Sequence, residues 1–287
     1  MNLPQHKLLK NGIFCMLLSC VFFSFMGAFV KIALQRVGVG QAIFCRSIIT
    51  ASILAIFMFK NKISFVGQHP LLLLGRALAG FTALSLNFYA VSKIPLGDAA
   101  ILNQTSPIFV ALLSAFLLGE RPSAYSLFLS AVSLLGVVLI IKPVFSHLNI
   151  AYVAGLLSGF MAALAYLSIR QLHNTDSSFT MAMYFAAVSS VFSFPWMLHH
   201  FSATFPFIWI LLVLSGLAGT LGQLFLTVAY KYEEAWVIAP INYSGVLFSF
   251  LWGIFLFKES PDLYSLMGSV LIIVSCILLT RRPSPLP

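Results

Sequence analysis

Two arginines lie inside long apolar stretches of the sequence, where a charged side chain is energetically costly. Arg46 lies within the apolar run 41–59, and Arg76 lies within the run 70–92. An arginine at the centre of a membrane helix costs roughly 2.5–3.5 kcal/mol on insertion scales. Its guanidinium presents a planar fork of N–H groups that matches a carboxylate or a phosphate. One interpretation is therefore an anion-binding site. The other is that the two side chains reach the membrane interface or cap a helix end.

No acidic side chain stands inside the apolar runs to pair with either arginine. All seven acids fall at the ends of runs or between them, at Asp98, Glu120, Asp176, Glu233, Glu234, Glu259 and Asp262. The six histidines also fall in the intervening segments or in the tails. Carriers driven by a proton gradient commonly use an Asp, Glu or His within the membrane. The absence of such residues from the runs predicts a uniporter or an exchanger.

Amide and phenol side chains near the middle of several runs add groups that form hydrogen bonds. Asn87 falls on the same helical face as Arg76, and Asn103 and Asn242 occupy matching positions in the two halves of the chain. Hydrogen bonds between helices, worth about 0.6 kcal/mol each, are the alternative role for such residues. The residues expected to contact a substrate are Arg46, Arg76, Asn87, Asn103, Gln104, Gln223, Asn242 and Tyr243.

The composition excludes the water-soluble classes of protein. Sixteen basic and seven acidic residues make up 8% of the 287 residues, whereas 60% are hydrophobic. A soluble domain averages roughly 25% charged residues. A soluble enzyme, a nucleic-acid-binding protein and a disordered scaffold are therefore excluded. The basic residues are spread between apolar runs, so the net charge of +9 forms no patch for nucleic acid.

Ten apolar runs have the length of membrane-spanning helices. About 20 residues cross the hydrocarbon core at a rise of 1.5 Å per residue. In lipid the backbone must satisfy its own hydrogen bonds, which favours helices. The sequence therefore predicts an all-α integral membrane protein with ten transmembrane helices. Their expected ranges are 11–34, 41–59, 70–92, 98–118, 125–141, 151–169, 179–198, 205–230, 235–257 and 263–279.

The short segments between the runs predict the orientation. With the N-terminus inside, nine Lys and Arg residues fall in inside segments and five in outside segments. This bias predicts that both termini are cytoplasmic, in a multi-pass protein of the cell (inner) membrane. The four cysteines all fall within runs and lack the spacing of metal ligands. No metal site and no cofactor are expected.

The two halves of the sequence match when one is shifted by 139 residues. Segment 118–127 falls on segment 257–266 with Glu, Pro, Tyr, Ser and Leu in matching places, and Asn103 falls on Asn242. Each half holds five runs, an odd number, so the second half enters the membrane from the opposite side. Such an inverted repeat is typical of carriers that work by alternating access. The expected domains are residues 1–142 and 151–282.

These features resemble the two EamA repeats of the drug/metabolite transporter superfamily. The segments that carry the resemblance are 103–107, 118–122 and 136–140 in the first half and 239–241 and 257–261 in the second. The resemblance covers nearly the whole chain. It implies that the first four helices of each repeat line a central cavity, with the fifth and tenth helices as supports. Glu120 and Glu259 are expected to shape loops rather than to touch a substrate.

A secondary transporter is the favoured function. The arginines favour an anionic or zwitterionic solute, such as an amino acid, an organic acid or a nucleoside-type metabolite like S-adenosylmethionine. A flippase of a lipid-linked substrate is the alternative. An enzyme is not expected, because the sequence has no His-Glu-x-x-His and no Gly-x-Ser-x-Gly motif. The expected partners are a small-molecule solute and the lipid bilayer, with no nucleic acid, and the expected state is a monomer or a homodimer.

Overall fold

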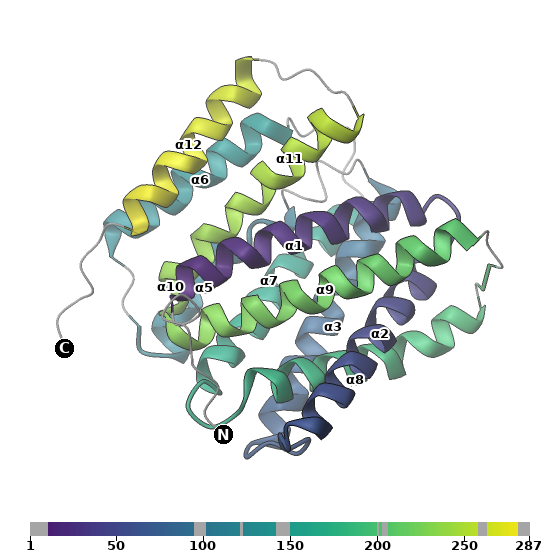
Figure 1. Cartoon of the computed structure of the whole chain (residues 1–287). Helices are drawn as coiled ribbons and strands as arrows, with labels where there is room; N and C mark the ends of the chain where they lie inside the picture. Colours follow the sequence, from purple (N-terminus) through teal and green to yellow (C-terminus); the bar gives the residue numbers. More distant parts are fainter. Residues whose placement is uncertain are drawn as a thin grey trace.

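The structure is a computed structural model of the chain, and every regular element in its described part is helical (Figure 1). It describes residues 11–94, 102–120, 123–141, 150–199, 201–202, 206–257 and 263–280. Asp98, Glu259 and the two ends of the chain, for which the sequence predicts places relative to the membrane, lie outside these residues. The all-α prediction is confirmed.

Among the described residues, six helices are long and apolar enough to cross a membrane, judged by length and composition. They are α1 (Gly12–Ala33), α2 (Val39–Lys60), α3 (Pro70–Lys93), α7 (Ile150–Gln171), α8 (Ser178–His199) and α9 (Pro206–Tyr232). The shorter elements are α5 (Ser106–Leu117), α6 (Ala124–Ile141), α10 (Ala235–Ile238), the 3-10 helix η2 (Ala239–Tyr243), α11 (Ser244–Phe257) and α12 (Leu263–Thr280).

Two of the ten expected spans are interrupted rather than continuous. The fourth has a break before α5, and the ninth consists of α10, η2 and α11 in succession. Each break is followed by a proline in the first turn of the next element, Pro107 in α5 and Pro240 in η2. A proline has no N–H to donate, so the regular hydrogen-bond ladder cannot run through these positions. The breaks place Gln104 and Asn242 at irregular backbone in the interior.

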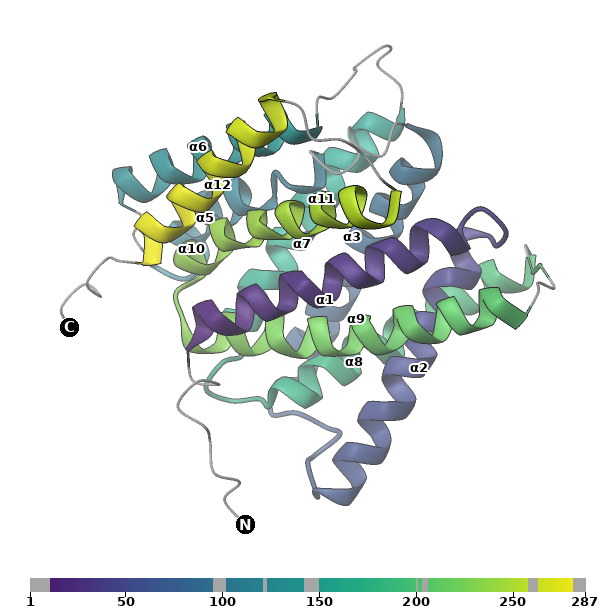
Figure 2. The ribbon, with the colours of Figure 1, turned by 45° about the horizontal axis from the view of Figure 1, so that its top comes forward.

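The helices pack in pairs that join the two halves of the chain (Figures 1 and 2). The most extensive contacts are those of α1 with α9, α3 with α7, α2 with α8, and α6 with α12. Under the 139-residue shift, α1 corresponds to α7 and α3 to α9, so the first two pairs are equivalents of each other. Each of the other two pairs joins a helix to its own counterpart. This arrangement is the one expected of two repeats around an approximate two-fold axis.

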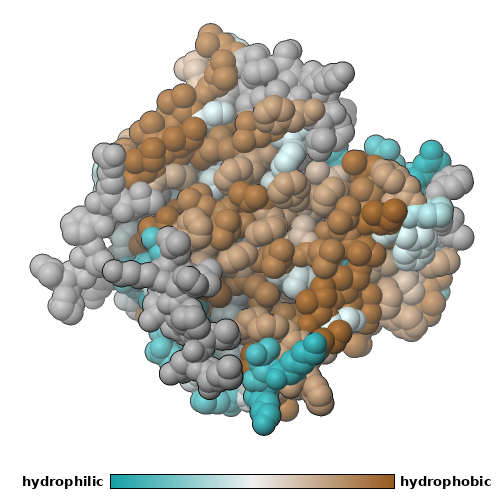
Figure 3. Space-filling view, viewed as in Figure 1, coloured by the Kyte–Doolittle hydropathy of each residue, from teal (hydrophilic) through white to brown (hydrophobic). Residues whose placement is uncertain are grey.

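The outer surface is apolar. Phe116, Leu71 and Phe59 are at least 80% exposed. Figure 3 shows apolar side chains over most of the face that includes α1, α9, α11 and α12. A surface of this kind would be unstable in water and suits the hydrocarbon of a bilayer. The chain is an integral, multi-pass membrane protein.

Helices α6 and α12 pack so closely against each other that their backbones are in contact. A Cβ atom added to Gly136 would lie 2.6 Å from the carbonyl oxygen of Gly268, and one added to Gly268 would lie 2.5 Å from that of Gly136. No side chain fits between them, so the two glycines allow this close crossing.

Candidate substrate-binding cavity

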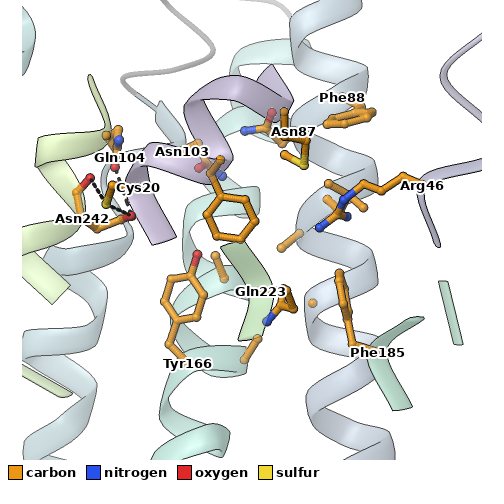
Figure 4. A pocket seen from close by; sticks show the side chains of 18 of the residues that line it. Cys20, Arg46, Asn87, Phe88, Asn103, Gln104, Tyr166, Phe185, Gln223 and Asn242 are labelled. Atoms are coloured by element: carbon orange, nitrogen blue, oxygen red, sulfur yellow. Dashed lines mark hydrogen bonds between the residues drawn. The ribbon is translucent and has the colours of Figure 1, made fainter. Parts of the chain in front are cut away.

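A cavity of about 290 Å³ lies between the helices of the two halves (Figure 4). Side chains from α1, α2, α3, α7, α8 and α9 line it, together with the two helix breaks. Seven of the eight residues that the sequence singled out are brought together here: Arg46, Arg76, Asn87, Asn103, Gln104, Gln223 and Asn242.

Two buried guanidinium groups lie close to the ring of one phenylalanine. The Cζ atoms of Arg46 and Arg76 are 5.6 and 5.3 Å from the centre of the Phe185 ring. Arg76 also donates from NH1 to the carbonyl oxygen of Met181, at 2.9 Å. Neither arginine is more than 4% exposed. Both side chains therefore stay inside the protein rather than reaching the membrane interface.

Three N–H groups of these arginines are left without a partner. Within the described part of the chain, Nε and NH1 of Arg46 and Nε of Arg76 are buried and form no hydrogen bond. The described residues that line the cavity include no acidic side chain. A buried cation without a counter-charge is costly, and an anion entering the cavity would supply both the charge and the missing acceptors.

Neutral polar groups lie on the opposite side of the cavity from Arg46 (Figure 4). Asn242 donates from Nδ2 to Oε1 of Gln104 at 3.5 Å, and the thiol of Cys20 lies 3.7 Å from Oδ1 of Asn242. Asn103 donates from Nδ2 to the hydroxyl of Ser158 at 3.0 Å. The long contacts are weak hydrogen bonds, so these amides can exchange partners with a solute. The cavity thus has one cationic end and one neutral, hydrogen-bonding end.

Tyr243 is the one expected site residue that lies elsewhere. It is fully buried and packs with Val137, Val246 and Ile272, on the side of η2 that faces α6 and α12. Asn242, the residue before it, lines the cavity. The structure places Tyr243 in the packing core between η2 and the supporting pair.

Several lining residues were not among those expected from the sequence. Phe185, Tyr166 and Cys20 contribute to the cavity wall. A single phenylalanine among 28 gives no signal in an apolar run. The 139-residue shift carries the one usable hint, because it aligns Phe185 with Arg46.

Gly219 makes room for the Arg46 side chain. A Cβ atom at this position would lie 2.7 Å from Nε of Arg46. We expect Gly219→Ala to displace the guanidinium and to weaken the binding of an anionic solute about tenfold, a loss of about 1.4 kcal/mol. Gly75→Ala is the matched control, since a Cβ at Gly75 meets no atom within 4 Å. Isothermal titration would measure both, and equal affinities in the two variants would contradict the expectation.

Glu120 joins three helices on the side of the membrane where α1 begins. Its Oε1 accepts from Nε of Arg170 at 2.9 Å, and its Oε2 accepts from the backbone N–H of Ala235 at 3.0 Å. Arg170 also donates from NH1 to the carbonyl oxygen of Lys231 at 3.3 Å. We call Glu120, Arg170, Lys231 and Ala235 the N-side network. The sequence suggested a loop role for Glu120; the structure shows it tying α5 to α7 and α10.

The N-side network lies directly beneath the cavity. Tyr166 lines the cavity one helical turn before Arg170, a rise of about 6 Å. Its ring stacks on that of Tyr230, with 5.0 Å between the ring centres. Tyr230 is fully buried. The stacked tyrosines thus lie between the cavity and the N-side network.

Two carboxyl groups beside the N-side network have raised pKa values. Burial raises the pKa of Glu233 and of Glu234, and Glu120 raises that of Glu234 further, while Arg170 opposes both. A raised value in the folded state means that the folded protein holds these protons more tightly than the unfolded chain. Their contribution to stability is therefore full below the ordinary value of 4.5 and is lost as the pH rises through the raised value.

The melting temperature should consequently rise as the pH falls from about 7 toward 5. The double variant Glu233→Gln/Glu234→Gln should show a flatter dependence, because neither amide titrates. Scanning fluorimetry at constant ionic strength would compare the two pH profiles. Parallel profiles would show that other groups control the pH dependence.

Comparisons with known proteins agree with the fold. The model of the EamA-like transporter family matches residues 10–142 and 149–281. A pseudopaline exporter of Pseudomonas aeruginosa, CntI, is 38% identical over 277 residues, covering 96% of this chain and 97% of its own. An S-adenosylmethionine uptake transporter of Rickettsia prowazekii is 25% identical, covering 93% and 91% of the two chains.

Two further proteins are similar to this chain, one in sequence and one in structure. Human solute carrier family 35 member G1 is 25% identical, covering 92% of this chain and 77% of its own. One solved crystal structure superposes with a TM-score of 0.79 at 15% identity, covering 95% of this chain and 99% of that one. The chain is a membrane transporter of a small metabolite, not an enzyme, and it belongs to the EamA-like transporter family.

Proposed function

We propose that the protein carries a small anionic or zwitterionic metabolite by alternating access, as a uniporter or an exchanger, with the anionic group of the solute bound at Arg46 and Arg76. The observation that carries this proposal is the set of three unpartnered N–H donors on two buried arginines. They belong to a cavity whose described lining includes no acidic side chain. A guanidinium fork in such a place matches a carboxylate or a phosphate.

The far end of the cavity defines a second requirement. Asn103, Gln104 and Asn242 offer amide donors and acceptors without a charge. The favoured solute therefore has an anionic group at one end and neutral hydrogen-bonding groups at the other. The volume of about 290 Å³ is at the lower end of ligand pockets, roughly 300–1,000 Å³. Amino acids and small organic acids fit this description.

The relatives support a metabolite carrier without fixing the solute or the direction. One is named an exporter of pseudopaline and another an uptake transporter of S-adenosylmethionine. S-adenosylmethionine carries a sulfonium and an ammonium group beside its carboxylate. The described cavity wall offers no carboxylate to these cations, so we favour a solute with a net negative charge or none.

The orientation follows from the positive-inside bias. We infer that both termini are cytoplasmic, in the cell membrane. The N-side network then lies on the cytoplasmic side of the cavity. Alternating access requires that this side be closed in one conformation and open in another.

A ligand screen on the purified protein tests the proposal. The panel consists of carboxylates and their amides in matched pairs: L-glutamate with L-glutamine, L-aspartate with L-asparagine, and succinate with succinamide. We expect the member with the additional carboxylate to raise the melting temperature more. Protection by succinamide but not by succinate would contradict an anion site, because succinamide carries no carboxylate. Protection only by lipid-linked compounds would favour a flippase instead.

A further inference from the structure

We propose that Phe185 is a positioning residue, which holds the guanidinium groups of Arg46 and Arg76 beside the cavity without accepting their hydrogen bonds and so determines the preference of the carrier for carboxylates over neutral analogues. This inference rests on the proposed function. It adds a role for a residue that bears no charge and forms no hydrogen bond with a solute.

The first support is geometric. Phe185 is 7% exposed and has both Cζ atoms within 5.6 Å of its ring centre. Arg76 is held a second time by α8, because its NH1 donates to the carbonyl oxygen of Met181, one turn before Phe185. One stretch of α8 therefore fixes Arg76 by a hydrogen bond and by a ring, and it fixes Arg46 by the ring.

The second support is chemical. The face of an aromatic ring carries negative potential and attracts a cation without accepting its N–H bonds in the plane of the fork. A carboxylate in the same place would satisfy the cations but would also occupy the donors. With Phe185 there, Nε and NH1 of Arg46 stay unpartnered. The ring thus stabilises the charges of the empty carrier and leaves their donors available to a solute.

The third support comes from the internal repeat. The 139-residue shift aligns Arg46 with Phe185 and Gly80 with Gly219. A Cβ at Gly219 would lie 2.7 Å from Arg46 Nε, and one at Gly80 would lie 3.0 Å from the Phe185 ring. Each side chain therefore lies against the equivalent glycine of the other half. Arg46 and Phe185, which occupy equivalent positions in the two repeats, are therefore in contact in the cavity.

Simple packing is the competing explanation. Phe185→Leu removes the ring and keeps an apolar side chain at the same place, so the two explanations differ in whether its effect depends on Arg46 and Arg76.

A thermodynamic cycle gives a test that needs no ligand. Phe185→Leu should lower the melting temperature by about 4 °C in the otherwise unchanged protein. It should lower it by less than half as much when Arg46 and Arg76 are both glutamine. Phe88→Leu is the matched control, since Phe88 lines the same cavity and is 8% exposed. Its effect should be equal in the two backgrounds. Equal effects of Phe185→Leu in the two backgrounds would overturn the proposal.

Binding of succinate and of succinamide, which carries no carboxylate, measures the functional consequence. We expect Phe185→Leu to reduce the preference for succinate about tenfold, and Phe185→Tyr to retain it. Retained preference in Phe185→Leu would overturn the role of Phe185. A parent protein without any preference would overturn the anion site instead, whereas the thermodynamic cycle would still decide whether Phe185 positions the arginines.

Discussion

Replacing Arg46 by glutamine should make the protein more stable and less able to bind an anion. The guanidinium is 4% exposed, and its Nε and NH1 have no partner among the described residues. Removing an uncompensated buried charge should stabilise the empty carrier by about 1–2 kcal/mol, or roughly 2–8 °C in melting temperature. A hydrogen bond to a charged group is worth about 1.5–3 kcal/mol, so anion affinity should fall by about one to two orders of magnitude.

Arg76 should respond differently, because it already donates to Met181. Arg76→Gln should lose anion affinity to a similar extent but gain little stability, since it leaves the Met181 carbonyl oxygen without its donor. Arg36→Gln serves as a control: Arg36 is exposed and lies between α1 and α2, away from the cavity. Titration calorimetry and scanning fluorimetry would record both quantities. Unchanged affinity in both Arg46→Gln and Arg76→Gln would refute the anion site.

Removing Glu120 should loosen the side of the carrier where α1 begins. Its carboxylate bonds Arg170 and the backbone N–H of Ala235, and its side chain is 10% exposed. Two hydrogen bonds to a charged group are lost in Glu120→Ala, each worth about 1.5–3 kcal/mol before relaxation. We expect amide exchange in α10 to accelerate about tenfold to a hundredfold, because the first N–H of that helix loses its acceptor. Hydrogen–deuterium exchange with mass spectrometry would measure this.

Variants of Arg170, the ion-pair partner of Glu120, test whether the two side chains act together. Arg170→Ala should accelerate exchange at the end of α7 and in α10, and the double variant should be little worse than either single variant. Lys60→Gln changes a charge on the same side of the membrane at an exposed position outside the network, and it should leave exchange unchanged. Additive effects of Glu120→Ala and Arg170→Ala would mean that the two side chains act separately.

The sequence was informative where a residue type contradicted its surroundings. Arg46 and Arg76 could be singled out because a charge in an apolar run is expensive, and the structure brings both to one cavity. The ten runs and the all-α fold could be predicted for the same reason, since lipid leaves few choices to the backbone. The amides could be singled out by their place near the middle of the runs.

The side of a helix to which a given side chain points could not be predicted with the same certainty. Asn242 and Tyr243 are adjacent, but they lie on opposite sides of η2, one facing the cavity and the other facing Val137 and Ile272. The segment Ala239–Tyr243 is a 3-10 helix, and the residue types alone do not indicate which of the two adjacent side chains faces the cavity. Phe185 was missed because an apolar residue in an apolar run costs nothing. The pairing of Glu120 with Arg170 was missed because it joins segments that are distant in sequence.

The crossing of α6 and α12 has a mechanical consequence. At Gly136 and Gly268 the two backbones already touch, with no side chain between them that could change rotamer to allow sliding. Translation of one helix along the other would press a carbonyl oxygen against a Cα atom. We therefore expect α6 and α12 to stay fixed to each other at this point. The remaining helices would rotate about it as the cavity is exposed to one side and then the other. A bulkier residue at either glycine would shift the pivot rather than perturb the solute, and should slow turnover at unchanged affinity.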